Sequence, residues 1–332
     1  MKLVSYRNDN IEHLGIYFKG HIYNLNSCDK EIPDNMKAFL EGEAPLMERA
    51  KDIQRQLESG KTFKEEVFYE LLAPVPHPSS CRDGYAFRQH VATARRNRKV
   101  EMIAEFDQYP VFYFTNHNAI VGPGEVNLMP DHFKKLDFEL EIAVVIGKRG
   151  RNIRAADADD YIAGFTIMND LSARTLQMEE MKLNLGPAKG KDFATAIGPW
   201  LVTPDELRPY LTKTKEGHTG NAYDLKMTAR VNEIEVSKGN VKDMDWTFAE
   251  IIERCAYGVD ILPGDVIGSG TVGTGCFLEL NGTGLLKDAD YPVQWLQPKD
   301  QITLEITGLG KLHNVMQAEG SDFSLLALKK NV

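Results

Sequence analysis

The sequence lacks an apolar run long enough to cross a membrane, because the longest one in its middle covers only residues 142–146. The chain turns polar soon after Met1, so we expect no signal peptide and a cytoplasmic location. Basic residues are fewer than acidic ones, and the net charge of −9 argues against the broad basic face that nucleic acid requires. These absences predict a soluble protein whose partners are neither membranes nor nucleic acids.

Cysteine is also scarce. The four cysteines stand far apart and form no CxxC pair, which argues against a disulfide framework or a zinc finger and predicts reduced thiols. What is present is a chain of 332 residues with 42% apolar residues. That length and composition suffice for one large domain with a sizeable core and a second, small one.

Residues 1–72 have the pattern of a small unit of their own. Short strands are predicted at 3–6, 14–18 and 21–25, and Leu46, Ala50, Ile53 and Leu57 recur at helical spacing. Residues 73–80 then contain three prolines, which neither a regular helix nor a central strand tolerates. We therefore predict an N-terminal α+β domain at 1–72 and a larger domain at 73–332.

The larger part is rich in strand candidates and poorer in helices. The predicted strands are 111–115, 138–146, 165–168, 200–202, 226–231, 276–280 and 301–306. The predicted helices are 155–162, 171–181 and 246–256, the last with Asp245 as its N-cap. Strands without regularly alternating helices predict an α+β, mainly β fold, built as a mixed β-sandwich or roll.

Two glutamates in the predicted strand 138–146 share one face. Side chains two apart in a strand point the same way, so Glu139 and Glu141 lie side by side, opposite Phe138, Leu140 and Ile142. Two adjacent carboxylates repel unless a proton or a cation lies between them, and Mg²⁺ or Ca²⁺ is the natural oxygen-seeking ion. The alternative is a solvated strand face, which these residues alone leave equally open.

A second acidic position follows another apolar strand. Asp170 ends that strand and precedes a predicted helix, so it is either a ligand or an ordinary helix cap. On the helix, Arg174 and Gln177 lie three residues apart and share a face. They are candidates to bind an anionic ligand near Asp170, and otherwise form a surface pair.

Three further sequence motifs accompany the glutamate pair in a characteristic order along the chain. They are MNDLSAR at 168–174, GKDF at 190–193 and PGDVIGSGT at 263–271. With the preceding glutamate pair, their order and spacing resemble the fumarylacetoacetate hydrolase family over most of residues 74–320. The resemblance implies that family's catalytic fold and a metal held by four carboxylates, which here are Asp83, Glu139, Glu141 and Asp170.

The segment at 81–90 narrows the resemblance to fumarylacetoacetase-type members. Its sequence, CRDGYAFRQH, resembles their loop that supplies a metal-binding Asp, a substrate-binding Tyr and a catalytic His, here Asp83, Tyr85 and His90. The resemblance implies that Glu279 orients this histidine. It also implies that Lys191, Arg174 and Gln177 act in catalysis, and that Tyr113 and Thr271 contact the substrate.

Two correspondences are weaker. A basic cluster of Arg95, Arg96, Arg98 and Lys99 replaces a single family arginine, and it either holds a substrate carboxylate or forms a solvated face. A tyrosine expected between Gln177 and Lys191 is missing, with Met181 or Lys182 in its place. This departure leaves the identity of the substrate open more than the chemistry.

The resemblance implies a metal-dependent hydrolase that cleaves a C–C bond in a 1,3-diketo acid, such as fumarylacetoacetate or a related acylpyruvate. In this mechanism His90 activates water, Glu279 stabilises the imidazolium, and fixed donors stabilise the oxyanion. It also implies a homodimer and a place in aromatic amino acid catabolism. The alternatives are a family decarboxylase, dehydratase or isomerase acting on a 2-keto acid, and a non-catalytic protein that binds a divalent cation for stability.

Overall fold

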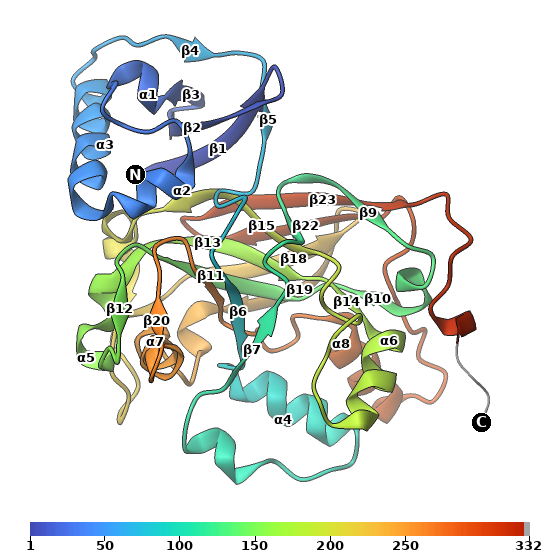
Figure 1. Ribbon diagram of the computed structural model, residues 1–332. Helices are drawn as coiled ribbons and strands as arrows, with labels where there is room; N and C mark the ends of the chain where they lie inside the picture. The colour runs from blue at the N-terminus through green and yellow to red at the C-terminus, as the bar shows by residue number, and fades with distance from the viewer. Residues whose placement is uncertain (329–332) are drawn as a thin grey trace.

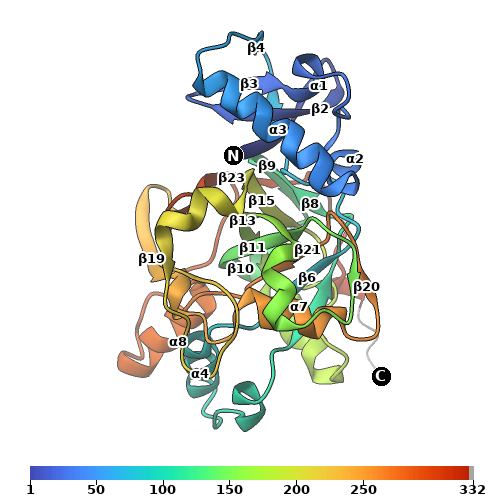
Figure 2. The same cartoon turned by 90° about the vertical axis from the view of Figure 1, so that its left-hand side faces the viewer.

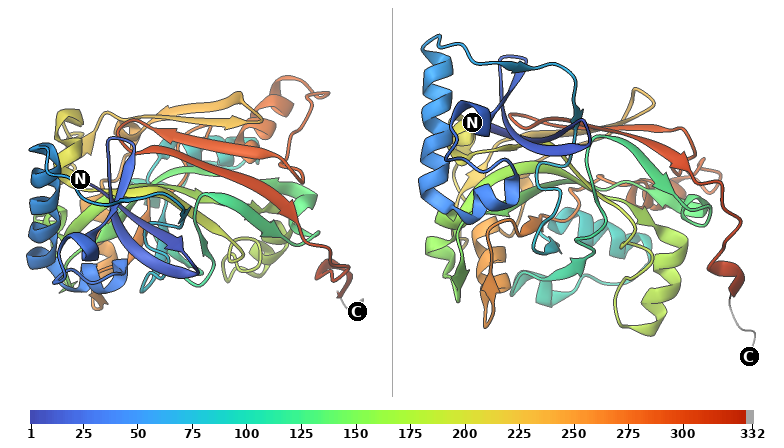
Figure 3. Two further views of the ribbon diagram at one scale, coloured as in Figure 1. Left: turned by 90° about the horizontal axis from the view of Figure 1, so that it is seen from above. Right: turned by 45° about the horizontal axis from the view of Figure 1, so that its top comes forward.

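The N-terminal unit is a small sheet covered by helices. Its elements are β1 (Lys2–Asn8), β2 (Ile11–Phe18), β3 (His21–Asn24), α1 (Leu25–Cys28), α2 (Met36–Glu41), α3 (Glu43–Glu58), β4 (Glu65–Glu66) and β5 (Glu70–Leu71). The unit stands at one end of the molecule, with α3 along its outer side (Figures 2 and 3). The predicted strands and the predicted helix of this region are confirmed.

The computed structural model describes residues 1–328, and within them this unit extends a larger sheet. The added strands are β6 (Cys81–Gly84), β7 (Phe112–Thr115), β8 (Ile120–Val121), β11 (Leu140–Ile146), β13 (Ile162–Asp170), β15 (Thr195–Val202) and β21 (Val266–Gly268). The twelve strands run β4-β3-β2-β1-β15-β13-β11-β21-β6-β7, with β5 on β1 and β8 on β15. Because Leu3 of β1 pairs with Leu201 of β15, the sheet continues across the predicted boundary near residue 72. The division into two domains stays a prediction.

A second sheet faces the first. Its strands, in spatial order, are β19 (Ile234–Asn240), β18 (Lys226–Val231), β22 (Gln301–Ile306), β23 (Gly310–Ala318) and β9 (Gly124–Leu128). Contacts of β13 with β22 and β23 join the two sheets (Figure 1). Three short ladders lie outside them: β10 (Leu136–Asp137) with β14 (Ser172–Ala173), β12 (Gly150–Arg151) with β20 (Asp260–Ile261), and β16 (Leu211–Thr212) with β17 (Ala222–Tyr223). The predicted α+β, mainly β sandwich is confirmed.

The helices lie mostly on the side away from the N-terminal unit (Figure 1). They are α4 (Arg88–Asn97), α5 (Ala155–Ala158), α6 (Arg174–Glu180), α7 (Phe248–Ala256) and α8 (Phe277–Lys287). Helix α4 packs against α8, and α5 packs against α7. Within residues 1–328, the structure contains no helix with both the length and the apolar character needed to span a bilayer.

Four expected elements differ from the structure. The helix expected at 171–181 covers only Arg174–Glu180, because Ser172 and Ala173 pair as strand β14. Residues 276–280 form the start of α8 and no strand, because the first turn of that helix is fixed by a distant carboxylate described below. The helix expected at 155–162 is one turn of α-helix followed by a 3₁₀ turn, and Ile162 already belongs to β13. Helix α7 begins after Thr247, not Asp245, because Thr247 and Glu250 form a reciprocal capping box.

Strand β11 lies between the two hydrophobic cores of the molecule. Leu140, Ile142 and Val144 pack into the core between the two sheets, whereas Ala143 and Val145 pack into the core beneath the N-terminal unit. A strand buried on both faces needs a continuous apolar sequence, which explains the run LEIAVVI. The only charged side chain of this run is therefore far from solvent, and its position defines the site.

Candidate active site

Four carboxylates from separate segments come together at one end of the large sheet. Asp83 lies in β6, Glu139 directly precedes β11, Glu141 lies in β11, and Asp170 ends β13. One oxygen atom of each lies within 4.8 Å of those of the other three, and all four side chains are buried. Both alternatives considered from the sequence are therefore wrong for these residues: the glutamates are not on a solvated face, and the N-cap of α6 is Ala173, not Asp170.

Strand pairing explains this convergence. Strand β21 pairs with β6 on one side and with β11 on the other, so Gly268 lies opposite both Asp83 and Ala143. Strand β13 pairs with β11 and brings Asp170 to the same end. Gly268 has no room for a side chain, because a Cβ atom there would lie 2.4 Å from Asp83 Oδ1. The close approach of backbone and carboxylate thus favours glycine at this position, since a larger residue would displace Asp83 and Met168.

Two cations partly neutralise the cluster. Lys191 Nζ donates to Asp170 Oδ2 at 2.7 Å and also to Glu139 Oε2. Arg174 Nη2 donates to Glu139 Oε1 at 2.8 Å. Burial alone would raise the pKa of Glu139, but Lys191 and Arg174 outweigh it and lower the pKa to about 2. Glu139 is therefore the carboxylate of the cluster that the protein itself keeps ionised.

The other carboxyl groups are poorly compensated. Burial, followed by the charge of Asp170, raises the pKa of Asp83 to about 7. Burial, followed by the charge of Asp83, raises the pKa of Glu141 well above its usual value. Glu141 Oε2 and Asp170 Oδ1 are buried without a hydrogen-bond partner, a costly condition for carboxylate oxygens. An oxygen-only donor set with unsatisfied atoms fits a hard divalent cation such as Mg²⁺ or Ca²⁺.

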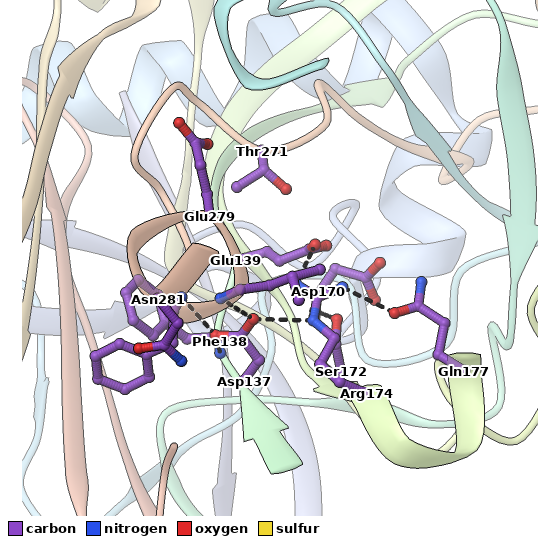
Figure 4. Close-up of polar contacts among 12 residues, drawn as sticks. Asp137, Phe138, Glu139, Asp170, Ser172, Arg174, Gln177, Thr271, Glu279 and Asn281 are labelled. Atoms are coloured by element: carbon purple, nitrogen blue, oxygen red, sulfur yellow. Dashed lines mark hydrogen bonds and ion pairs between the residues drawn. The ribbon is translucent and has the colours of Figure 1, made fainter. Parts of the chain in front are cut away.

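A histidine–glutamate pair lies beside the carboxylates. His90, on α4, contacts Glu279, on α8, with 2.7 Å between Nδ1 and the carboxylate, and both side chains are buried. Glu279 lies in the first turn of α8 (Figure 4). The ring of Tyr85 packs edge-on against His90 at 6.0 Å between centroids. The structure therefore brings together His90 and Glu279, which the resemblance links with acid–base chemistry, and Tyr85, which it links with substrate binding.

A cavity of about 790 Å³ opens onto these groups. Its lining includes Asp83, Glu139, His90, Tyr113 and Thr271. The Tyr113 hydroxyl donates to Asp170 Oδ2, and Thr271 Oγ1 lies 3.5 Å from Glu141 Oε1. Two of the three predicted substrate contacts thus also contact the carboxylate cluster, and the third, Tyr85, lines the same cavity.

The basic cluster divides between the cavity and the surface. Arg95 and Arg98 line the cavity, whereas Arg96 donates to Thr283 and Lys99 is exposed. Two cationic side chains are thus available to an anionic ligand. Where the sequence lacks the expected tyrosine, Met181 lines the cavity and Lys182 does not appear among its lining residues. Met181 therefore gives this wall of the cavity an apolar side chain.

Arg174 and Gln177 are less free than the sequence indicated. Arg174 is buried and donates to Asp137, Glu139 and Gln177, the last through the carboxamide oxygen at 2.9 Å (Figure 4). Its guanidinium charge is therefore already used by protein carboxylates. The Gln177 amide group keeps its N–H donors for a ligand, because only its oxygen accepts from Arg174.

Asp137 is a site residue that sequence reasoning missed. It is fully buried and accepts from Arg174 Nε at 2.9 Å and from the backbone N–H groups of Phe277 and Leu278 at 2.7 and 3.0 Å. It thereby joins the arginine that holds Glu139 to the first turn of the helix that carries Glu279. The sequence did contain a signal for Asp137. It lies two residues before Glu139, as Glu139 lies two before Glu141, so in an extended chain the three share a face.

Comparison with known proteins gives the relatives of this arrangement. Residues 80–317 match the model of the fumarylacetoacetate (FAA) hydrolase C-terminal domain. The chain is 32% identical over 321 residues to the human mitochondrial oxaloacetate tautomerase FAHD2A, covering 95% of this chain and 91% of the relative.

Two solved structures have the same fold. Fumarylacetoacetate hydrolase from Exiguobacterium antarcticum is 23% identical, with a TM-score of 0.67 over 96% of this chain and 100% of that one. The 5-carboxymethyl-2-hydroxymuconate delta-isomerase from Mycobacterium smegmatis is 21% identical, with a TM-score of 0.65 over 97% and 100%. The proteins similar to this chain thus include a hydrolase, an isomerase and a tautomerase by name.

Proposed function

Because the chain belongs to the fumarylacetoacetate hydrolase family, we propose that it interconverts the enol and keto forms of a small 2-oxo acid, with His90 carrying the proton. In this reaction the enol oxygen loses a proton and the neighbouring carbon gains one, while the carbon skeleton stays intact. The observation that carries the proposal is the buried His90–Glu279 pair at the edge of a cavity that also contains the carboxylate cluster.

The carboxylate cluster supplies the cation site of this proposal. Asp83, Glu139, Glu141 and Asp170 would hold Mg²⁺ or Ca²⁺, whose chemical contribution is Lewis-acid stabilisation of negative charge on an enolate oxygen. Lys191 and Arg174 hold Glu139 and Asp170 in place by direct hydrogen bonds. The remaining steps belong to the side chains around the cavity.

His90 is suited to take up and return a proton. A carboxylate at Nδ1 favours the tautomer with the proton on that nitrogen, which leaves the lone pair of Nε2 for a ligand in the cavity. Glu279 also stabilises the imidazolium formed when Nε2 accepts a proton. Arg95 and Arg98 are positioned on the cavity wall to bind a carboxylate of the substrate.

The state of Arg174 and Lys191 favours proton transfer over hydrolysis. Hydrolysis needs strong donors for the oxyanion that forms after water attack. Both cations already bind protein carboxylates. Arg174 donates to Asp137 and Glu139, and Lys191 donates to Glu139 and Asp170. Proton transfer at carbon forms no tetrahedral oxyanion, and the cation site would stabilise the charge on the enolate oxygen. The likeness to a protein named oxaloacetate tautomerase supports the same choice.

Cleavage of a C–C bond in a 1,3-diketo acid is the second candidate. The same His90–Glu279 pair is suited to activate water, and the Gln177 amide has N–H donors for an oxyanion. The cavity of about 790 Å³ also has room for an acid larger than oxaloacetate. Both reactions pass through an enolate, so one site can serve either of them.

The test is an assay of the purified full-length protein with Mg²⁺ or Ca²⁺ against enol-oxaloacetate, acylpyruvates and fumarylacetoacetate. Tautomerisation removes the enol absorbance without changing the carbon skeleton, whereas hydrolysis yields two acids that NMR separates. Decarboxylation releases carbon dioxide and dehydration releases water. His90→Asn should lower the turnover by roughly 10²- to 10⁴-fold. Wild-type turnover in that variant would refute the assigned role, and His117→Asn, at an exposed histidine, is the matched control.

A further inference from the structure

A second group of metal-binding atoms lies beside the carboxylate cluster. A ring nitrogen of His90, a carboxylate oxygen of Glu139 and Sγ of Cys276 lie within 4.8 Å of one another, and all three side chains are buried. We infer that these residues, here called the Cys276 site, bind Zn²⁺ or another thiophilic divalent cation and so withdraw His90 from proton transfer.

The donor atoms distinguish this site from its neighbour. The carboxylate cluster offers only oxygen, which suits Mg²⁺ and Ca²⁺, whereas sulfur, nitrogen and oxygen together suit Zn²⁺. Zinc bonds of about 2.0 to 2.3 Å in a tetrahedron separate neighbouring ligand atoms by roughly 3.5 Å. Because the three atoms lie within 4.8 Å of one another, each pair needs to approach by at most roughly 1 Å. Binding forms bonds to sulfur, nitrogen and oxygen, and the thiol proton is released to solvent.

The orientation of His90 is an independent observation that points to a ligand. A histidine that binds a metal usually gives its other ring N–H to a carboxylate, which fixes the ring and raises its basicity. Glu279 already has this relation to Nδ1, at 2.7 Å, so Nε2 is the nitrogen left for the cation. His90 and Glu139 line the cavity, which gives the ion a path and an open fourth position.

Zinc at this site has a functional consequence. A cation on Nε2 occupies the lone pair that the proposed proton transfer uses, and a cation on Glu139 competes with Lys191 and Arg174. Inhibition by zinc thus rests on the proposed function, whereas the binding itself rests only on the positions of the three donors. The two parts need separate measurements.

Cobalt(II) tests the binding without any activity assay. Added to the full-length protein in excess Mg²⁺, it should give the near-ultraviolet charge-transfer band of a thiolate–cobalt bond. Cys276→Ser should abolish this band, and Cys28→Ser, at a half-buried cysteine of α1 in the N-terminal unit, should keep it. The absence of the band in the wild type, or its persistence in Cys276→Ser, would overturn the site.

A second variant guards against misfolding of the first. His90→Asn retains Cys276, and removal of the nitrogen ligand should weaken cobalt binding by at least roughly tenfold in a titration of the same band. An unchanged affinity would equally overturn the site. For the functional part, the zinc concentration for half-inhibition should rise at least roughly tenfold in Cys276→Ser relative to wild type. Equal zinc inhibition of the wild type and of Cys276→Ser would refute the claim that zinc at this site withdraws His90 from proton transfer. The cobalt experiment would still test the binding itself.

Discussion

At the scale of single residues, Asp137 has the widest effect on the site. It neutralises Arg174, which holds Glu139, and it fixes the N–H groups at the start of α8, which carries Glu279. A negative charge at a helix N-terminus is favourable, and here it is also buried and ion-paired. One carboxylate therefore controls the position of both a candidate metal ligand and the partner of the candidate base.

Replacement of Asp137 should affect stability and turnover together. Asp137→Ala leaves Arg174 with a buried, uncompensated part of its charge, so the free energy of unfolding should fall by about 3–5 kcal/mol. Turnover should fall roughly 10- to 100-fold at temperatures where the variant is folded, because Arg174 no longer fixes Glu139. Urea denaturation and initial rates measure the two effects. Asp157→Ala, at an exposed aspartate of α5, should change neither.

His132 gives the protein a dependence of stability on pH. Burial, followed by the charge of Lys189, lowers the pKa of His132 from its usual value of 6.5 to about 4. The unfolded chain therefore binds more protons between these values, and stability is lost as the pH falls through that window. His132→Asn keeps an acceptor for the Met129 N–H, and its unfolding free energy should fall less from pH 7 to pH 5. Equal losses in variant and wild type would contradict this account.

At the scale of elements, the alignment of β6, β21 and β11 sets the geometry of the carboxylates. Asp83 and Glu141 reach each other only because Gly268 lies between their strands without a side chain. The restriction is steric and belongs to the strand pairing, not to any single carboxylate. It gives a way to move Asp83 without removing it.

Gly268→Ala should therefore weaken metal binding without touching a ligand. The added Cβ would lie 2.4 Å from Asp83 Oδ1 and 2.7 Å from Met168 Sδ, so both must shift. Such overpacking costs about 1–3 kcal/mol of stability. Calorimetric titration with Mg²⁺ or Mn²⁺ should show reduced affinity. Gly320→Ala is the control, since nothing lies within 4 Å of its added Cβ. Unchanged affinity in Gly268→Ala would show that Asp83 does not bind the ion.

The elements also show what sequence patterns can and cannot predict. Strands β18 and β22 have the predicted bounds, because buried side chains alternate with less buried ones along most of each strand. Residues 276–280 are apolar at almost every position, and such a run does not distinguish a strand from a buried helix. The deciding contact comes from Asp137, which is 140 residues away from Phe277. Local patterns contain no information on that contact.

At the scale of the whole molecule, the same limit applies to the N-terminal unit. Its strands and its long helix follow from local periodicity. Its pairing with β15 joins Leu3 to Leu201, and the sequence near either residue does not indicate this contact. Strand periodicity made Glu139, Glu141 and Asp170 candidates with the alternatives open, and only the resemblance to a family added Asp83 and joined the four in one site. Homodimer formation and a cytoplasmic location stay predictions, and light scattering of the purified protein tests the first.

The distribution of buried charge leads to a prediction for the complete protein. Among residues 1–328, the buried acids of the site form ion pairs only with Lys191 and Arg174; these acids are Asp83, Asp137, Glu139, Glu141 and Asp170. The excess must be met by protons or by a bound cation, since an unpaired buried charge is costly. A cation that binds only the folded state stabilises it by about 2.7 kcal/mol at one hundred times its dissociation constant.

Addition of Mg²⁺, Ca²⁺ or Mn²⁺ to chelator-treated protein should therefore raise its melting temperature, and EDTA should reverse the rise. Glu141→Gln removes one ligand and one buried acid, so the metal-free variant should be at least as stable as the metal-free wild type but gain less from the cation. Asp224→Asn, at an exposed acid, should respond as wild type does. A metal that restores turnover as well as stability supports an enzyme, whereas one that restores stability alone supports the non-catalytic alternative. If none of the three ions moves the melting temperature, the carboxylate cluster is held by protons and is not a cation site.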